Sequence, residues 1–189
     1  MAMAAQGLVN WWRRGTPGIM LHQISIREHS LMRRINGWRP PRWIRWWMLI
    51  ATRCGDGWLW VAMGLAILAF GDERRWAAVA AAGVAAAAGI VLFKFLKHAT
   101  GRTRPVAPHC WAKLLPPDRF SFPSGHSITA FAVALALGLF YPSLLLGLLF
   151  CAISVAVSRI MLGLHFLSDV IAGSAIGSLL GYAAFALFG

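Results

Sequence analysis

Residues 142–188 read PSLLLGLLFCAISVAVSRIMLGLHFLSDVIAGSAIGSLLGYAAFALF, and this stretch decides the fold. It contains two apolar runs, 144–157 and 166–188, on either side of a short segment with polar and charged side chains. A helix that crosses a membrane needs about 20 predominantly apolar residues, within a range of about 17–25. The two runs therefore predict two membrane-spanning helices joined by a polar connection.

Three more apolar runs precede this stretch, at 58–70, 76–96 and 127–140. Short polar turns at 71–75 and 141–143 separate neighbouring runs. The pattern predicts about five transmembrane helices, or six if the N-terminal region contributes one.

The composition is that of a membrane protein. Hydrophobic residues make up 59% of the 189-residue chain and charged residues 13%, whereas ordinary globular chains average roughly 45–50% and 25%. Mean hydropathy is +0.64. Disorder needs the opposite combination, low hydrophobicity with high charge, and a water-soluble monomer needs more polar surface. We therefore expect an all-α fold, a polytopic membrane helix bundle.

The first 54 residues are predicted to form a basic interfacial region, followed by a membrane-embedded core at 55–189. Nine of the 18 Lys and Arg residues lie in this region, together with six tryptophans. Interleaved Arg and Trp suit the membrane–water interface, where indoles lie at headgroup level and guanidinium groups reach phosphates. The stretch Trp43 to Thr52 is short and contains Arg45, so it predicts either an interfacial helix or the start of an imperfect span.

The formal net charge of +12 points to an anionic partner. Nucleic acid is one class of anionic partner, but the basic residues here lie between apolar runs rather than in a contiguous soluble domain. We therefore expect no nucleic acid, and name the lipid bilayer and a phosphorylated membrane lipid as the partners.

The connectivity predicts that polar residues distant in sequence meet on one face of the membrane. The runs 127–140 and 144–157 form a hairpin, so the loop 98–125 and the segment 158–165 lie on the same side. Three clusters stand on this face: Lys97 with Arg104-Pro105, then Pro123-Ser124-Gly125-His126, then Ser158-Arg159 with His165 and Asp169.

The clusters concentrate positive charge at the ends of apolar segments, where ions are unfavourable unless they are paired or functional. Lys97, Arg104 and Arg159 are expected to face only one nearby carboxylate, Asp169. The surplus of positive charge predicts a phosphate ligand, because the planar fork of Arg donates two parallel hydrogen bonds to phosphate.

The remaining residues of the clusters suit catalysis. The Ser124-Gly125 turn opens a helix and would aim backbone N–H groups at an anion. His165 and Asp169 are four residues apart and are expected on one helical face. A carboxylate that accepts from Nδ1–H would leave Nε2 as a nucleophile, and His126 could protonate the leaving oxygen.

A metal site is the rival use of two histidines and a carboxylate, which can hold iron or zinc. Three neighbouring cations would repel a metal ion and attract an anion, so we expect no metal here. The chemistry predicted instead is phosphoryl transfer to histidine, followed by attack of water.

Together the clusters resemble the signature of the type 2 phosphatidic acid phosphatase superfamily, the lipid phosphate phosphatases, which share their core with vanadium-dependent haloperoxidases. The family pattern is Lys-x6-Arg-Pro, then Pro-Ser-Gly-His, then Ser-Arg-x5-His-x3-Asp. Lys97 to Pro105, Pro123 to His126 and Ser158 to Asp169 match it at every fixed position. The resemblance covers roughly residues 55–188.

The resemblance implies that His165 is the nucleophile, Asp169 its partner, and His126 the general acid that later activates water. It implies no metal and no other cofactor. The residues that it implies hold the phosphoryl oxygens are Lys97, Arg104, Ser124, Gly125 and Arg159.

The implied function is that of an integral membrane lipid phosphate phosphatase that hydrolyses a phosphomonoester or diphosphate through a phosphohistidine. Bacterial members of similar size act on undecaprenyl diphosphate, phosphatidylglycerophosphate, phosphatidate or lipid A phosphate. The substrate expected here is of the undecaprenyl diphosphate, phosphatidylglycerophosphate or phosphatidate type. A lipid-to-lipid phosphotransferase and a non-enzymatic phospholipid-binding or transport protein stay open. His165 with Asp169 favours an enzyme, since binding alone needs cations but no oriented nucleophile.

The resemblance also implies a bacterial inner membrane protein with its active site on the periplasmic face. The active-site face carries seven Lys and Arg from Lys94 onward, and the opposite face has Arg74 and Arg75. The positive-inside rule alone would therefore place the site in the cytoplasm. On an oxidising periplasmic face, Cys54 and Cys110 could form a disulfide.

Overall fold

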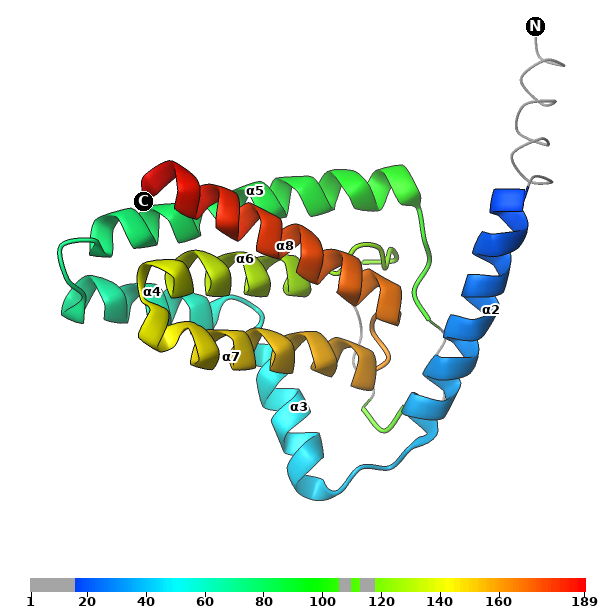
Figure 1. Ribbon diagram of the computed structural model, residues 1–189. Coiled ribbons are helices and arrows are strands. Elements are labelled where there is room, and N and C mark those ends of the chain that lie inside the picture. Colours follow the sequence, from blue (N-terminus) through cyan, green and yellow to red (C-terminus); the bar gives the residue numbers. More distant parts are fainter. Residues whose placement is uncertain (1–15, 106–109, 113–117) are drawn as a thin grey trace, which may run out of the picture.

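The computed structural model describes residues 16–105, 110–112 and 118–189, which contain seven helices and no strand (Figure 1). Trp11 and Trp12 of the expected interfacial region lie outside the described residues. The helices are α2 (Thr16–Gly37), α3 (Arg42–Cys54), α4 (Trp58–Phe70), α5 (Arg75–Thr100), α6 (Gly125–Phe140), α7 (Pro142–Met161) and α8 (Leu167–Phe188).

Helices α5 to α8 run side by side in alternating directions, as Figure 1 shows. The short turns before α5 and between α6 and α7 reverse the chain and so favour antiparallel neighbours. As a result, the C-terminal ends of α5 and α7 meet the N-terminal ends of α6 and α8 at one end of the bundle. Helix α2 lies across that same end.

A stripe of glycines brings α8 into backbone contact with α6. A Cβ atom placed on Gly173 would lie 2.7 Å from the carbonyl oxygen of Ser124, and one on Gly181 would lie 2.5 Å from that of Ala132. Gly177 is packed in the same way against the backbone of Ile128. The four-residue spacing of these glycines predicts close helix packing, and the structure confirms it.

Small residues of α5 form a second close packing surface against α6, in addition to the glycine stripe of α8. Ala78, Ala81 and Ala85 are buried, and a Cβ on Gly89 would meet the side chain of Ile128. Small side chains therefore line the faces that α5 and α8 turn toward α6, which is why α6 is buried along most of its length.

The all-α expectation is confirmed for the described residues, whereas the expected number of spans is not. Helices α5, α7 and α8 are long and apolar enough to cross a membrane, and the bent pair α3–α4 would add a fourth span. Helix α6 is apolar but has only 16 residues. By length and composition, the described residues thus contain three or four candidate spans, and the expected number of five or six is not confirmed.

Helices α3 and α4 meet at an angle of 66°. On α3, Trp43, Trp46 and Trp47 are exposed, whereas Met48 and Ala51 are buried against the bundle. Exposed indoles on a helix that turns away from the direction of its neighbour suit a position in the headgroup region. The stretch Trp43 to Thr52 is thus helical, and its two interpretations, an interfacial helix and the start of an imperfect span, stay predictions.

Replacing Gly177 with Ala is expected to destabilise the bundle. The new Cβ would overlap the backbone of Ile128, so α6 and α8 would have to separate, and such overpacking typically costs about 1–3 kcal/mol. Thermal unfolding in detergent should therefore show a lower Tm than that of the unmodified protein. Gly147→Ala in α7 is the matched control, because a Cβ there meets nothing within 4 Å. Equal Tm values for the two variants would contradict the contact.

Candidate active site

The polar clusters converge where four helix ends meet. A cavity of about 440 Å³ opens there, and Lys97, Arg104, His126, Arg159 and His165 all contribute to its wall. Lys97 lies in the last turn of α5, His126 in the first turn of α6, and Arg159 in the last turn of α7. The predicted convergence on one face of the hairpin is thereby confirmed.

His165 does not lie on a helix, contrary to the sequence-based expectation. It belongs to the link between α7 and α8, just before Phe166, which caps α8. Its ring is 1% exposed, and its Nε2 accepts a hydrogen bond from Nη1 of Arg104 at 3.1 Å. A ring that accepts at Nε2 carries its proton on Nδ1. Nε2 thus holds the lone pair, and His165 lines the cavity.

Burial is the main reason why the pKa of His165 is lowered to about 4. The charges of Arg104 and Arg159 act in the same direction, and Asp169 opposes them. The ring is therefore neutral at neutral pH, which is the form that a nucleophile requires.

Asp169 stands beside His165 but does not hydrogen-bond to it. The distance from its Oδ2 to Nδ1 of His165 is 3.7 Å, beyond the range of a hydrogen bond. Oδ2 instead accepts from the backbone N–H of Phe166 at 2.8 Å, and Oδ1 accepts from Arg102 at 2.7 Å. The contact with His165 is thus electrostatic, and Asp169 also fixes the start of α8.

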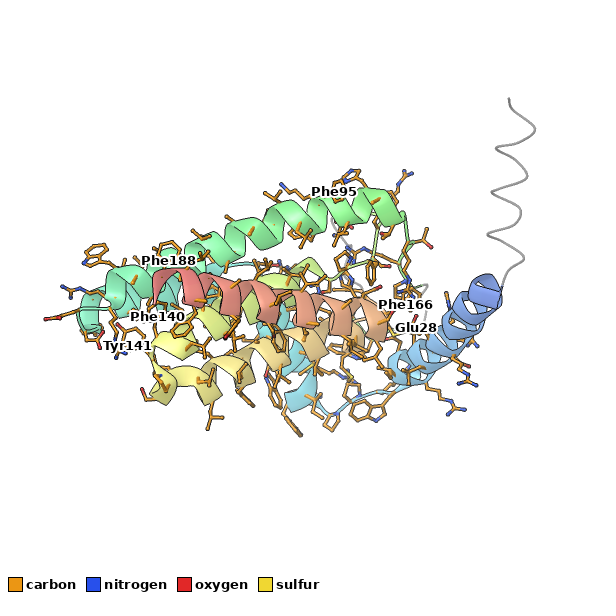
Figure 2. The ribbon with its side chains drawn as sticks, turned by 45° about the horizontal axis from the view of Figure 1, so that its top comes forward. Glu28, Phe95, Phe140, Tyr141, Phe166 and Phe188 are labelled. Atoms are coloured by element: carbon orange, nitrogen blue, oxygen red, sulfur yellow. The ribbon has the colours of Figure 1, made fainter. Side chains whose placement is uncertain are left out.

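Glu28 of helix α2 stabilises the start of α8 and the position of Arg102. One carboxylate oxygen of Glu28 accepts from the backbone N–H of Ser168 at 3.0 Å, and the other pairs with Arg102. Figure 2 shows Glu28 next to Phe166, over whose ring the Arg102 guanidinium lies at 4.3 Å. Arg102 therefore connects α2 to Asp169.

Lys97 and Arg104 share a carboxylate that the sequence analysis missed. Asp118 accepts from Nζ of Lys97 at 2.5 Å and from Nη2 of Arg104 at 2.7 Å. Burial opposes ionisation of Asp118, but the hydrogen bonds from the two cations hold its pKa below the usual range. The expectation that Asp169 is the sole nearby carboxylate is therefore wrong, because an ionised Asp118 bridges two of the three cations that were expected to bind phosphate.

Arg159 keeps unused hydrogen-bonding capacity. Its Nη1 donates to the hydroxyl of Thr52 on α3 at 2.6 Å, whereas its buried Nε has no hydrogen-bond partner. A buried guanidinium N–H without a partner is unfavourable. Its place in the cavity wall makes an anion in that cavity a suitable acceptor.

Ser124 and Gly125 occupy different positions in the site. Ser124 is fully buried as the cap of α6, where its hydroxyl contacts Ser127 and its N–H donates to the carbonyl of Asp169. It ties α6 to α8, and it does not line the cavity. Gly125 does line the cavity, and its N–H lies in the first helical turn, where no intrahelical acceptor exists.

His126 also has a carboxylate partner that the sequence analysis missed. Its Nε2 lies 2.8 Å from Oδ1 of Asp56, which sits in the turn between α3 and α4. Glu28, Arg102, Asp118 and Asp56 thus all belong to the site. Arg102 stands inside the Lys-x6-Arg stretch, and the three carboxylates are among only six acidic residues in the chain. That scarcity was the available signal.

A family model described as the PAP2 superfamily matches residues 77–189. The chain belongs to this superfamily. The family resemblance read from the motifs is confirmed.

Curated relatives of the chain are lipid phosphatases by name. Lipid A 1-phosphatase of Rhizobium johnstonii is 41% identical over 94 residues, which cover 47% of this chain and 38% of that protein. The chain thus spans well under half the length of this relative. Decaprenylphosphoryl-5-phosphoribose phosphatase of Mycobacterium tuberculosis is 36% identical over 129 residues, which cover 66% of this chain and 68% of that protein.

A solved structure extends the likeness to the whole bundle. The crystal structure of a transmembrane PAP2-type phosphatidylglycerolphosphate phosphatase from Bacillus subtilis matches with a TM-score of 0.67 at 25% identity. The match covers 87% of this chain and 86% of that one. Together with the apolar helices, it identifies a membrane protein.

All three cysteines are free thiols in the structure. The sulfur of Cys110 lies 3.8 Å from the carbonyl oxygen of Met161. The suggested disulfide between Cys54 and Cys110 is therefore not formed.

Asp118→Asn is expected to tighten the binding of inorganic phosphate or vanadate by roughly tenfold, or about 1.4 kcal/mol. The ionised Asp118 competes with an incoming anion for Lys97 and Arg104, and an amide of equal size does not. Isothermal titration of the detergent-solubilised protein measures the change. Glu73→Gln, in the turn between α4 and α5, is the charge-matched control. Unchanged or weaker anion binding by Asp118→Asn would show that the carboxylate does not compete.

Proposed function

We propose that the chain is a membrane phosphatase that removes a phosphoryl group from a lipid through a phosphohistidine on His165. One observation carries the proposal: His165, whose neutral ring has its lone pair on Nε2, lines a cavity whose wall also contains Lys97, Arg104 and Arg159. A lone-pair nucleophile surrounded by cations is suited to attack at phosphorus.

In the first step, the lone pair of Nε2 attacks phosphorus and forms a P–N bond while the bond from phosphorus to the lipid oxygen breaks. His126 transfers a proton to that oxygen, so the lipid leaves as an alcohol, or as a monophosphate when the substrate is a diphosphate. Arg104 moves from Nε2 to the phosphoryl oxygens, where its guanidinium stabilises the developing charge. Asp169 stabilises the positive charge that the ring of His165 acquires.

In the second step, water attacks phosphorus and the P–N bond breaks. His126, now neutral, takes the proton from the water, and the electron pair of the broken bond returns to Nε2 of His165. Inorganic phosphate leaves and both rings regain their starting protonation states. Lys97, Arg159 and the N–H of Gly125 hold the phosphoryl oxygens throughout.

The apolar wall of the cavity supports a lipid substrate. Apart from the charged residues, the wall is formed by apolar side chains. They are Trp60 and Val61 of α4, Ile90 and Phe93 of α5, and Val133 of α6. A phosphate at the charged end would leave a lipid tail against these side chains. The named substrates of the relatives, lipid A and a decaprenyl-linked sugar phosphate, share this combination of a phosphate and long chains.

The metal alternative fits the site less well. Among the described residues, no three His, Cys, Asp or Glu side chains gather as a metal-binding group. The nitrogen that a metal would need, Nε2 of His165, faces the guanidinium of Arg104 at 3.1 Å. A fixed positive charge at that distance disfavours a second cation.

His165→Asn should abolish phosphate release, because the amide cannot form the phosphoenzyme. We expect a fall on the order of 10⁴-fold or more, as for nucleophile removal elsewhere. The measurement is phosphate release in detergent from polyprenyl diphosphate, phosphatidate, phosphatidylglycerophosphate and lipid A, each with EDTA present. Persistent activity in the variant would refute the mechanism.

The same assay discriminates the rival functions. Vanadate should inhibit by occupying the cation cluster. Loss of activity with EDTA would favour a metal enzyme, and phosphoryl transfer to an added lipid acceptor without phosphate release would favour a phosphotransferase. Anion binding by a protein that releases no phosphate from any lipid would favour a binding protein.

The site lies on the periplasmic side of the inner membrane in this proposal. Four of the seven basic residues on the active-site face, Lys97, Arg102, Arg104 and Arg159, are engaged within the site itself. These four residues therefore say little about membrane topology. Without them, the Lys and Arg count no longer argues strongly for a cytoplasmic site. Lys113, another of the seven, lies outside the described residues.

The orientation can be tested with single cysteines in a cysteine-free background. Arg119 is exposed and follows Asp118 of the site directly in the chain. Glu73 is exposed in the turn between α4 and α5, and Figure 1 shows this turn at the opposite end of the bundle. In intact spheroplasts, a membrane-impermeant maleimide should label Arg119→Cys and should label Glu73→Cys only after lysis. The reverse pattern would place the site in the cytoplasm.

A further inference from the structure

A carboxylate from outside the matched part of the chain touches His126. Oδ1 of Asp56 lies 2.8 Å from Nε2 of His126, and both residues line the cavity. The family model matches residues 77–189, so Asp56 is not among the residues it covers. The contact joins the turn between α3 and α4 to the start of α6, 70 residues further along the chain.

The turn that carries Asp56 is built for this approach. Gly55 lies so close to the ring of His126 that an added Cβ would be 3.1 Å from Cδ2 and 2.7 Å from Val155. Gly57 has a φ of +119°, a conformation that L side chains rarely adopt. The glycines on both sides of Asp56 therefore allow the backbone to approach the ring of His126 closely and then to turn into α4.

We propose that Asp56 is a positioning residue that fixes the tautomer of His126 and favours its protonated form for donation to the leaving lipid oxygen. This inference rests on the proposed phosphatase function. With Nε2–H donating to Asp56, Nδ1 is the nitrogen that exchanges a proton with substrate and water.

The charges around the cavity explain why a protonated His126 needs a carboxylate partner. Burial lowers the pKa of His126, and the positive charges of Arg159 on α7 and Lys97 on α5 act in the same direction, whereas Asp56 opposes them. Arg104, Asp118 and His165 line the rest of the same cavity. Asp118 is paired with Lys97 and Arg104, and His165 is neutral, so Asp56 is the carboxylate in contact with His126. A carboxylate in hydrogen-bond contact favours the imidazolium.

The two catalytic steps use this pair differently. In the first, the imidazolium donates its Nδ1 proton to the lipid oxygen as the P–O bond breaks, and Nε2–H stays with Asp56. In the second, neutral Nδ1 accepts the proton of the attacking water. Asp56 holds the ring in one orientation across both steps, as a carboxylate does for a catalytic histidine in hydrolases.

A simple surface ion pair is the alternative role of Asp56. Its other oxygen lies 3.7 Å from Nη1 of Arg53, whose side chain is 78% exposed. Exposed pairs of this kind contribute little to stability. The pair therefore gives no reason for the two glycines that bring Asp56 against His126.

The test compares Asp56→Asn with the unmodified protein on two substrates. One is a long-chain alkyl phosphate, whose leaving oxygen needs a proton, and the other is 4-nitrophenyl phosphate, whose leaving group departs without one. For the alkyl phosphate we expect kcat to fall about 100-fold, the lower end of general acid–base contributions, with little change in KM. The fall should be much smaller for the aryl ester, and the alkaline limb of kcat/KM should move to lower pH.

Two further comparisons separate positioning from structural support. Asp56→Asn should add no further loss in a His126→Asn background, since it acts through that ring. Asp56→Glu should recover part of the kcat lost in Asp56→Asn and part of the shift of the alkaline limb of kcat/KM. It replaces Asp56→Asn in the test if that variant does not fold. Asp72→Asn, at the opposite end of the bundle, is the matched control. Equal losses on both substrates with an unmoved pH profile, or additive losses in the double variant, would overturn the proposal.

A readout that needs no turnover keeps this inference separable from the proposed function. In protein with ¹⁵N-labelled histidine, the resonances of His126 should titrate at lower pH in Asp56→Asn than in Asp72→Asn. Should the protein release no phosphate from any lipid, the phosphatase function fails while this titration still reports the coupling. If His126 titrates at the same pH in both variants, Asp56 does not affect its protonation and the proposal fails.

Discussion

Lys97, Arg102, Arg104 and Arg159 bring four positive charges to the end of a bundle that is otherwise apolar, and their neutralisation governs the architecture of that end. Buried or half-buried cations are stable only with partners. The chain has only six acidic residues, and four of them, Glu28, Asp56, Asp118 and Asp169, lie at this end. Each one contacts a cation or a histidine. Four carboxylates thus formally balance the four cations, and in the proposed function a phosphate would exchange with one of these carboxylates.

The glycine stripe makes this charge cluster possible. Close approach of α8 to α6 lets the N–H of Ser124 reach the carbonyl of Asp169, at 3.0 Å. That hydrogen bond joins the start of α6, which carries His126, to the start of α8, which follows His165. Wider helix spacing would separate the two histidines. The packing of the apolar faces of α6 and α8 therefore sets the geometry of the proposed catalytic groups.

The sequence predicted helices at the positions of α4 to α8 and the convergence of the clusters, because the apolar runs and their order can be read directly from the sequence. Helix α2 was not predicted, because its residues form no long apolar run. The run 58–70 corresponds to α4, and Lys97, His126, Arg159 and His165 meet as the hairpin topology requires. The helical placement of His165 was wrong, because the link before Phe166 leaves the ring outside α8. Asp56 and Asp118 could not be placed from spacing, since each reaches the site from a turn or loop whose path depends on tertiary contacts.

The N-terminal region is part of this site and more than a membrane anchor. Glu28 on α2 pairs with Arg102, and Thr52 on α3 receives a hydrogen bond from Arg159, although both lie within the first 54 residues. Helix α3 also exposes its tryptophans and leads directly into the turn that holds Asp56. In the proposed function, the tryptophans of α3 would lie in the headgroup region while Thr52 on the same helix accepts a hydrogen bond from Arg159. Because one short helix would then link the membrane surface to the proposed site, the depth of those indoles would bear on the positions of Thr52 and Asp56.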